Sequence, residues 1–513
     1  MEFDPKRSSL WISSTPPAPV AHPALDRDVR VDAAVIGAGV TGITAAYLLK
    51  KAGKTVALLE RGRAALAETG HTTAHLTHVL DTRLTHLVRT FGEGNAKAAW
   101  DSSEVAIRQI ETLVRREDIR CDFRRVPGYL FAPDDKDVPL LEEEQRWATR
   151  FGYQATRTDP GSFPFRSRLA LRFEGQARFQ PRRYLLALLE KVPGDGSFVF
   201  ENTGVKSVEH DGGQRVVTDN GRTVRCGHVV VAAHVPFNNR YAIHVKQAAY
   251  RSYVIAARMP KGQLPDALYW DTLDPYHYVR LQPNGDHDLV ILGGEDHKTG
   301  QVTDTDAAYR RLIDYLRDQL GPEATLVGHW SGQIMETIDG LPYIGANVDA
   351  PETELVATGY AGNGMTYGTL AGMMLSDRVL GRETPWDRLY NPSRIKARGL
   401  RDFIAENVDF PLHLVKDWLS GADARSPEDV RPGEGKIVRV GGKKVAVYRE
   451  DNGELHGCSP VCPHMGCQVH WNNTERTWDC PCHGSRFLPT GEVLNGPAVS
   501  GLERVPLAEP AHA

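Results

Sequence analysis

The stretch VIGAGVTGITAAYLL, residues 35–49, decides the fold of the first part of the chain. An apolar strand leads into Gly37-Ala38-Gly39-Val40-Thr41-Gly42, and a helix-compatible run follows. Glycines at these three positions let the backbone approach a pyrophosphate, whose charge is met by free N–H groups at the helix N-terminus. The stretch therefore predicts a dinucleotide-binding βαβ unit.

The next predicted strand, VALLE, ends at Glu60, and Arg61 follows it. A carboxylate at this place can accept hydrogen bonds from the hydroxyl groups of an adenosine ribose. A glycine turn without a ligand is the alternative, and the succession of strand, loop, helix and acid argues against it. This pattern alone does not distinguish FAD from NAD.

Length, composition and charge narrow the class of protein. A chain of 513 residues is long enough for two to four domains, and 41% hydrophobic with 25% charged residues is typical of a globular protein. A net charge of -4 gives no reason to expect a nucleic-acid partner. No run approaches the ~18 apolar residues of a membrane span, and the Pro-rich N-terminus lacks the apolar core of a signal peptide. We therefore expect a cytoplasmic protein.

The C-terminal region carries two metal-ligand motifs, CPHMGC at residues 462–467 and CPCHGS at residues 480–485. Cys462 and His464, with Cys480 and His483, offer the two thiolates and two imidazoles of a Rieske 2Fe-2S centre. Zinc is the alternative for any set of two cysteines and two histidines. The C-x-H spacing, and the further cysteine in each loop, favour the iron–sulfur cluster.

Five of the seven cysteines lie between residues 458 and 482. Such clustering in a chain without a secretory signal indicates metal or redox chemistry before a disulfide framework. Cys121, Cys226 and Cys458 lie outside both motifs, and we interpret them as structural thiols.

Residues 31–385 resemble the FAD-dependent glycine and D-amino-acid oxidase (DAO) superfamily. The resemblance rests on the glycine fingerprint with Glu60 and Arg61, on GVKSVE (204–209) followed by GHVVVAA (227–233), and on DGLPYIG (339–345) with ATGYAGNGMTYG (357–368). It implies FAD as the cofactor. It also implies an α/β (α+β) fold, in which a Rossmann-like FAD-binding domain is combined with a β-sheet substrate domain.

The resemblance further implies which residues meet FAD. Val205 would lie by the adenine, and residues 362–366 would meet the flavin ring at a helix N-terminus, which favours negative charge. The implied cofactor-binding residues are Gly37, Gly39, Val40, Thr41, Gly42, Glu60, Arg61, His71, Thr72, Thr73, Ala74, Val205, Ala232, Gly362, Asn363, Gly364, Met365 and Thr366. The chain departs from the family after Ala232, where Ala233-His234-Val235-Pro236-Phe237 replaces the common A-G-x-W-S.

The segment GHTTAHLTH, residues 70–78, contains three histidines, and Asp81 follows. His75, His78 and Asp81 could form a 2-His-1-carboxylate iron site, which would make the protein an oxygenase. Such spacings arise often by chance, so we expect His75 and His78 to be packing or surface residues. Some relatives attach flavin through a histidine near His71, although non-covalent FAD is the default.

Residues 426–513 resemble the Rieske domain family, which is all β. The resemblance implies that Cys462 and Cys480 hold the buried iron, and that His464 and His483 hold the outer iron. It also implies a disulfide between the remaining pair of the two loops, Cys467 and Cys482, as in respiratory-type members.

Two residues beside the cluster bear on its redox potential. Ser485 matches the family serine that donates a hydrogen bond to a bridging sulfide. Phe487 stands where high-potential members carry a tyrosine, so one donor is absent. We therefore expect a potential below the top of the Rieske span of about −150 to +300 mV.

These assignments predict four regions and their order along the chain. They are an N-terminal arm (1–30), DAO-type FAD-binding and substrate domains (31–383, with the substrate sheet at roughly 240–330), a helical connector (384–425) and a Rieske domain (426–513). On the substrate sheet Tyr278 and Arg280 are candidate catalytic residues, since an arginine can pair a substrate carboxylate in a bidentate fork. An ordinary surface strand is the alternative, and Arg251 and Tyr253 share this status.

The two predicted redox sites together indicate an FAD/Rieske oxidoreductase. We expect a dehydrogenase that oxidises a C–N bond, less readily a C–O bond, of a small amine or amino-acid-like substrate by hydride transfer to FAD. The electrons would then pass through the Rieske cluster to an external protein or quinone-like acceptor. The alternative is an NAD(P)H-driven reductase that feeds a partner oxygenase. This alternative requires a second nucleotide-binding fold, but the sequence has no second G-x-G-x-x-G motif after a predicted strand.

Overall fold

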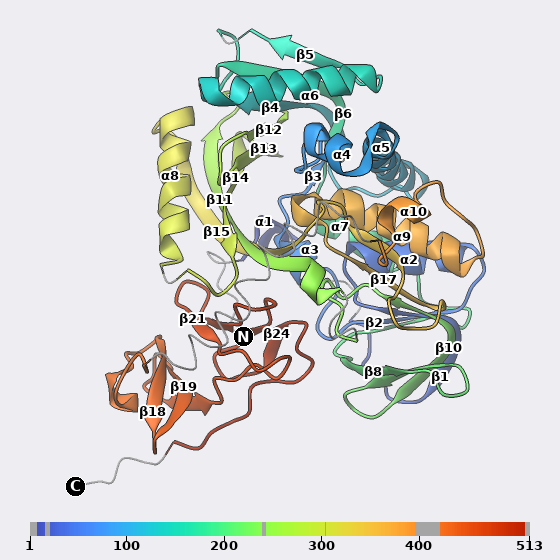
Figure 1. The fold of residues 1–513 in the computed structure, drawn as a ribbon, viewed down its shortest axis with the longest axis vertical. Coiled ribbons are helices and arrows are strands. Elements are labelled where there is room, and N and C mark those ends of the chain that lie inside the picture. The colour runs from blue at the N-terminus through green and yellow to red at the C-terminus, as the bar shows by residue number, and fades with distance from the viewer. Residues whose placement is uncertain are drawn as a thin grey trace.

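The computed structural model describes residues 8–15, 21–159, 161–238, 243–302, 304–394 and 421–507. Two large sheets with helices form the body, and two small sheets form the C-terminal domain (Figure 1). The predicted α/β class, with an all-β C-terminal domain, is confirmed. Most of the predicted connector, residues 384–425, lies outside the described residues. Among the described residues no helix is long and apolar enough to cross a membrane.

The first large sheet is the nucleotide-binding one, with the order β16-β17-β10-β1-β2-β7; β9 pairs with β10, and β8 pairs with β9. Strand β1 pairs in parallel with both β10 and β2, as a βαβ unit requires. The strands are β1 (Val29–Ile36), β2 (Val56–Leu59), β7 (Phe198–Phe200), β8 (Val205–Glu209), β9 (Gln214–Thr218), β10 (Thr223–Val231), β16 (Tyr343–Ala346) and β17 (Glu354–Thr358).

Two helices, α2 (Val40–Lys51) and α9 (Gly364–Val379), pack together on one face of this sheet. Two glycines of α9 allow the two helices to lie close together. A Cβ atom on Gly368 would overlap Val40, and a Cβ atom on Gly372 would lie only 2.7 Å from the Cβ atom of Thr44. As a result the N-termini of both helices reach the same cavity, which is described below.

The second large sheet carries the predicted substrate strands, in the order β15-β11-β14-β13-β12-β4-β6-β3 with β5 beside β6. Along β11, Tyr253 and Ile255 pack under α8 (Asp306–Leu320), whereas Ser252 and Val254 face the cavity. The strands are β3 (His75–Leu76), β4 (Arg124–Ala132), β5 (Ala155–Thr158), β6 (Leu169–Arg178), β11 (Gln247–Pro260), β12 (Leu268–Asp271), β13 (His277–Asn284), β14 (His287–Lys298) and β15 (Thr325–Thr337).

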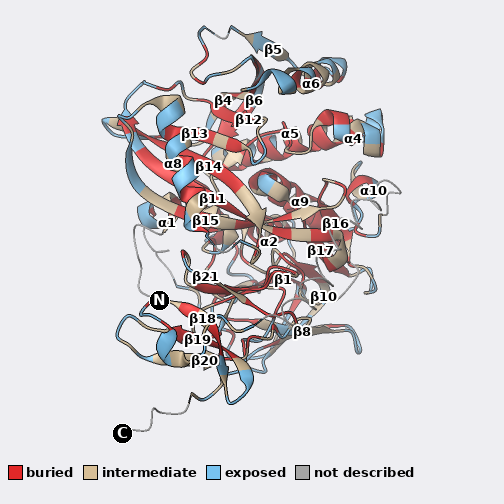
Figure 2. Cartoon of the chain, turned by 60° about the vertical axis from the view of Figure 1, so that its left-hand side comes forward, coloured by how far each residue is buried: buried red, intermediate tan, exposed pale blue. Residues whose placement is uncertain are grey.

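The central strands of both sheets are buried, and the outer turns of α6 and α8 are exposed (Figure 2). The remaining helices are α1 (Leu10–Ser14), α3 (Glu68–His71), α4 (Leu84–Phe91), α5 (Glu93–Arg116), α6 (Val138–Arg150), α7 (Pro181–Leu189) and α10 (Asp387–Tyr390).

The C-terminal domain lies against the lower end of the second sheet (Figure 1). Its core contains Val469, Trp478 and Phe487, all fully buried. Its antiparallel strands are β18 (Gly435–Val440), β19 (Lys443–Arg449) and β20 (Leu455–Cys458) in one sheet, and β21 (His470–Asn472), β22 (Thr477–Asp479), β23 (Arg486–Phe487) and β24 (Val493–Asn495) in the other.

A charged cluster holds this domain in place. Glu475 of the C-terminal domain accepts hydrogen bonds from Arg251 of β11 and from Arg486. Both arginines are at most 4% exposed, and Arg486 also bonds Asp479 at 2.9 Å. Although burial raises the pKa of Glu475, the two arginines hold that pKa below its usual value. Removal of one member would leave an uncompensated buried charge, at a cost of about 3–5 kcal/mol.

The N-terminal segment, expected only as a Pro-rich arm, contributes a buried anchor. Trp11 of α1 is fully buried, and its indole N–H donates to the carbonyl of Thr72 at 2.5 Å. The Arg280 guanidinium lies over the indole ring, 5.2 Å from its centroid. Helix α1 therefore fixes the loop that the DAO resemblance assigns to flavin binding.

We predict that Trp11→Ala lowers the free energy of unfolding by about 3–5 kcal/mol, the usual loss for a buried tryptophan, and lowers the FAD content of the purified protein. Thermal unfolding and flavin absorbance measure both effects. Ser14→Ala, at an exposed position of the same helix, is the control. An unchanged melting temperature with full flavin content would contradict the anchoring role.

Candidate redox site

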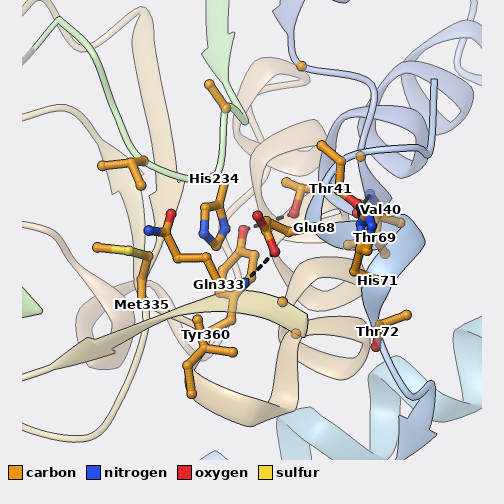
Figure 3. Close-up of a pocket in the computed structure, with 18 of the residues that line it drawn as sticks. Val40, Thr41, Glu68, Thr69, His71, Thr72, His234, Gln333, Met335 and Tyr360 are labelled. Atoms are coloured by element: carbon orange, nitrogen blue, oxygen red, sulfur yellow. Dashed lines mark hydrogen bonds between the residues drawn. The ribbon is translucent and has the colours of Figure 1, made fainter. Parts of the chain in front are cut away.

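A cavity of about 290 Å³ lies between the two large sheets (Figure 3). Its wall takes residues from β1, the loops after β2 and β10, the loop before α9, and strands β11, β13 and β15. Residues of the C-terminal domain complete it, namely Asn495, Gly496, Ala498 and Val499. All the predicted FAD residues line this cavity except Gly42, Ala74 and Thr366.

The glycine loop has the geometry that a pyrophosphate cradle requires. Gly37 has φ +99°, a left-handed conformation, and a Cβ there would lie 3.0 Å from the Ala232 carbonyl carbon. A Cβ on Gly42 would overlap the Gly37 carbonyl oxygen, so Gly42 serves the close packing of helix on loop. Gly37, Gly39 and the first residues of α2 line the cavity, and the Val40 N–H donates to the Thr69 hydroxyl at 3.2 Å. The site therefore fits a dinucleotide phosphate.

Glu60 and Arg61 line the end of the cavity that the DAO resemblance assigns to the adenosine, and both also have structural contacts. The Glu60 carboxylate accepts hydrogen bonds from the backbone N–H groups of Ala38 and Gly62, each at 2.8 Å. Arg61 donates to the Leu494 carbonyl of the C-terminal domain at 2.6 Å. Arg61 thus connects the nucleotide end of the cavity to β24.

The opposite end of the cavity is formed by the loop before α9. Asp81 and Asn363 hold this loop, because the Asp81 carboxylate accepts from the Gly362 N–H at 2.9 Å and the Asn363 side chain accepts from the Asp81 N–H at 3.1 Å. Thr366 donates to the Thr77 carbonyl and is fully buried, so it stabilises α9 from behind the wall. Ala74 is also fully buried, with φ 60°.

The histidines of residues 70–78 do not converge on one point. His75 lines the cavity, and burial together with Arg280 lowers its pKa to about 3. His78 instead packs among aromatic rings, 5.3 Å from Trp100 and 4.8 Å from Tyr153 between centroids. His78 is therefore a packing residue and His75 a residue of the cavity wall, and this arrangement gives no support to an iron site with Asp81. His71 lines the cavity.

Of the two candidate catalytic residues, Tyr278 lines the cavity and Arg280 does not. The Tyr278 hydroxyl lies 2.7 Å from the Ser252 hydroxyl. Arg280 is fully buried and donates to the carbonyls of Thr73, Ala74 and Phe179. The interpretation of Arg280 as a carboxylate clamp is therefore corrected: its guanidinium supports the flavin loop from behind.

The two further candidates on β11 also have structural roles. Arg251 bonds Glu475, as described above, and Ser331. Tyr253 points to the α8 side of the sheet, where its hydroxyl lies 2.9 Å from His297. Neither residue is part of the cavity wall.

Sequence reasoning missed a group of polar residues at the middle of the cavity, where Glu68, His234 and Gln333 face one another (Figure 3). Glu68 accepts from the backbone N–H of Gln333 at 2.5 Å and from the Asn495 side chain at 2.8 Å. His234 has φ 63°, and burial lowers its pKa. The departure from the family pattern at His234 was the only signal in the sequence for this group.

The predicted cluster ligands come together in the C-terminal domain. The thiols of Cys462 and Cys480 are in contact and almost fully buried. The rings of His464 and His483 are perpendicular, with centroids 4.9 Å apart. Two sulfur and two nitrogen ligands at one place fit a Rieske cluster, with the thiols on the inner side.

The two loops that carry these ligands are joined by a disulfide between Cys467 and Cys482. Ser485 is fully buried, and its hydroxyl oxygen accepts from the Ala498 N–H at 3.1 Å. Because a hydroxyl that accepts through its oxygen can still donate its hydrogen, Ser485 remains a donor toward the cluster. Phe487 packs in the domain core.

The imidazole side of the cluster site faces the FAD-binding body. The ring of His244, which precedes β11, lies 4.9 Å from that of His464 and 5.9 Å from that of His483. Gln333 of the cavity wall donates to the Gly484 carbonyl at 2.8 Å. Gly484 follows His483 directly, so one side chain connects the cavity to a ligand loop.

Residues 32–378 match the family described as FAD dependent oxidoreductase (DAO), and residues 422–506 match the Rieske [2Fe-2S] domain. The chain belongs to the FAD-dependent oxidoreductase family. Its DAO region binds FAD, and its Rieske domain binds a 2Fe-2S cluster. The cofactors predicted from the sequence are therefore confirmed.

Relatives share both the sequence and the fold. The chain is 34% identical to the putative Rieske 2Fe-2S iron-sulfur protein YhfW of Bacillus subtilis (strain 168), over 95% of this chain and 96% of the relative. It is 22% identical to γ-glutamylputrescine oxidoreductase of Escherichia coli (strain K12), over 72% and 88%. The crystal structure of glycine oxidase from Geobacillus kaustophilus superposes with a TM-score of 0.61 at 19% identity, over 72% and 99%.

We predict that the cluster of the wild-type protein has a midpoint potential below about +300 mV, and that Ser485→Ala lowers it because a donor to sulfur is lost. Phe487→Tyr should raise it by adding a donor. Redox titration followed by EPR measures all three, with the exposed Ser500→Ala as control. A wild-type midpoint at or above +300 mV, or no shift in Ser485→Ala, would contradict this account.

Proposed function

We propose that the protein is a dehydrogenase that oxidises a C–N bond of an amine or amino-acid-like substrate and passes the electrons through its Rieske cluster to an external acceptor. The observation that carries the proposal is the shared cavity wall, in which the FAD-binding body and the Rieske domain both contribute residues. An oxidase that delivers electrons directly to O₂ has no need of such a joint wall.

The chemistry follows from the two cofactors and one water molecule. Bound FAD supplies a two-electron acceptor, and the bound cluster supplies a one-electron carrier. The substrate loses a hydride from the carbon beside nitrogen, and water hydrolyses the resulting imine to a carbonyl compound and ammonia or an amine. Each turnover therefore releases two electrons and two protons, and the electrons leave one at a time to the acceptor.

The chain's own residues position this reaction. The N-terminus of α9, which begins at Gly364, favours negative charge at the flavin end of the cavity. Tyr278 and Trp270 line the side that belongs to the second sheet, and Ser252 orients the Tyr278 hydroxyl. His75 is neutral at physiological pH and so brings no charge to this wall. The similarity to γ-glutamylputrescine oxidoreductase supports a substrate with an amino group.

We expect an anaerobic screen of amines, amino acids, NADH and NADPH to identify an amine or amino acid that bleaches the flavin absorbance and then produces the EPR signal of the reduced cluster. The flavin should lose its absorbance first, because the substrate carbon is oxidised in the FAD cavity. Bleaching by NADH or NADPH, and by none of the amines or amino acids, would contradict the proposal and favour the reductase alternative.

Gln333 offers a direct test of the route between the sites. Gln333→Leu keeps the size of the side chain but removes the hydrogen bond to Gly484. We predict that flavin reduction stays unchanged while cluster reduction becomes several-fold slower, as measured by anaerobic stopped-flow absorbance and freeze-quench EPR. Gln263→Leu, on an exposed turn, is the control. Equal slowing of both phases would indicate a general defect instead.

A further inference from the structure

A segment of the Rieske domain, residues 494–499, lies along the wall of the FAD cavity. It runs from the end of β24, and Asn495, Gly496, Ala498 and Val499 of this segment line the cavity. The DAO match ends at residue 378, so this part of the wall lies outside the region to which FAD binding is assigned. The position of the segment along the cavity decides which part of FAD it can contact.

Two hydrogen bonds place the start of the segment at the nucleotide half of the cavity. Arg61, at the end assigned to the adenosine, donates to the Leu494 carbonyl at 2.6 Å. The Asn495 side chain donates to Glu68 at 2.8 Å. The threonine after Glu68 accepts a hydrogen bond from the first N–H group of α2, at the pyrophosphate cradle. The segment therefore extends from the adenosine end to the pyrophosphate end.

The segment is held in this position from both of its sides. The two carboxylate oxygens of Glu68 accept from the Asn495 side chain and from the backbone N–H of Gln333, so Glu68 fixes Asn495 to the FAD-binding body. On the other side, the Ala498 N–H donates to the hydroxyl of Ser485 in the loop that carries cluster ligands. One segment thus contacts both the FAD cavity and the cluster site.

Val499 is the observation that points to a ligand. Among the described residues four large apolar side chains are exposed, and of these Val499, at 46%, is the one that lines the cavity. The other three are Val302, Leu326 and Val327. An apolar side chain gains free energy when a bound group removes it from water. A dinucleotide in the cavity supplies such a group.

We propose that residues 494–499 of the Rieske domain are part of the FAD-binding site. The segment covers the nucleotide half of bound FAD, with Asn495 beside the pyrophosphate and Val499 packed against the dinucleotide. The two domains therefore close the site together. By linkage, bound FAD stabilises the docked Rieske domain by the same free energy by which docking stabilises FAD. This holds whatever the substrate and the electron acceptor are.

The first test measures the release of FAD from the full-length protein that carries both cofactors, followed by the rise in flavin fluorescence after dilution. Val499→Ser should speed this release several-fold, because an apolar contact with FAD is lost. Val302→Ser is the matched control, since it makes the same substitution at a valine that is 39% exposed and does not line the cavity. The control should release FAD at the wild-type rate.

The second test locates the segment along FAD by titrating ADP into the full-length, cluster-containing protein after FAD has been removed. Asn495→Leu should weaken both FAD and ADP by about tenfold, the effect of one hydrogen bond to a charged group. Asn452→Leu is the matched control, because Asn452 also donates to a glutamate, Glu450, but on an exposed turn of the Rieske domain. The EPR signal of the cluster shows that each variant keeps a folded Rieske domain.

Three results would overturn the inference. If Val499→Ser and Asn495→Leu both hold FAD as tightly as the wild-type protein, the segment is not part of the FAD site. If Asn495→Leu weakens FAD but not ADP, the segment does not cover the nucleotide half. If Val302→Ser speeds FAD release as much as Val499→Ser, the effect does not come from the cavity wall. Val499→Ser removes no hydrogen bond, so the first test stands even if Asn495→Leu does not fold.

Discussion

The arrangement of this protein depends on one carboxylate, that of Glu475, which lies between the buried Arg251 of the second sheet and the buried Arg486 of the Rieske domain. Two buried arginines need this carboxylate beside them, because without it they would be uncompensated buried charges. The Rieske domain is thereby fixed on the end of β11. Loops of the cluster site consequently reach the wall of the FAD cavity.

Because the Rieske domain is held in this position, residues from both parts of the molecule meet at the middle of the cavity. Glu68 is bonded to both parts of the molecule, to Gln333 of β15 and to Asn495 of β24. His244 covers the imidazole side of the cluster site, so that side faces inward to the body. The FAD cavity and the cluster site are therefore in direct contact, through the hydrogen bond from Gln333 to Gly484.

The sequence was sufficient where function depends on short local motifs. The glycine loop, the cysteine and histidine ligands and the disulfide follow from spacing and family resemblance, because backbone conformation and ligand chemistry restrict which residues can stand there. Residues of the cavity centre, such as His234 and Glu68, depend on how distant segments meet. Trp11 is the clearest case, since a tryptophan in a Pro-rich arm gives no sign that it anchors a flavin loop sixty residues away.

The strand that carries Arg280 was predicted from the sequence, but the role predicted for Arg280 was wrong. It lies in β13 two residues after Tyr278, and alternation along a strand places both side chains on the same face. Whether the guanidinium contacts a substrate or the backbone depends on the loop that faces β13. Here the carbonyls of Thr73 and Ala74 in that loop accept its hydrogen bonds.

The central claim is that electrons pass from flavin to cluster within one chain. Its most direct test is the rate of cluster reduction after rapid anaerobic mixing with a reducing substrate, measured over a wide range of protein concentrations. A docked Rieske domain predicts a first-order rate that is independent of protein concentration. A rate that rises in proportion to protein concentration would show transfer between molecules and contradict the account.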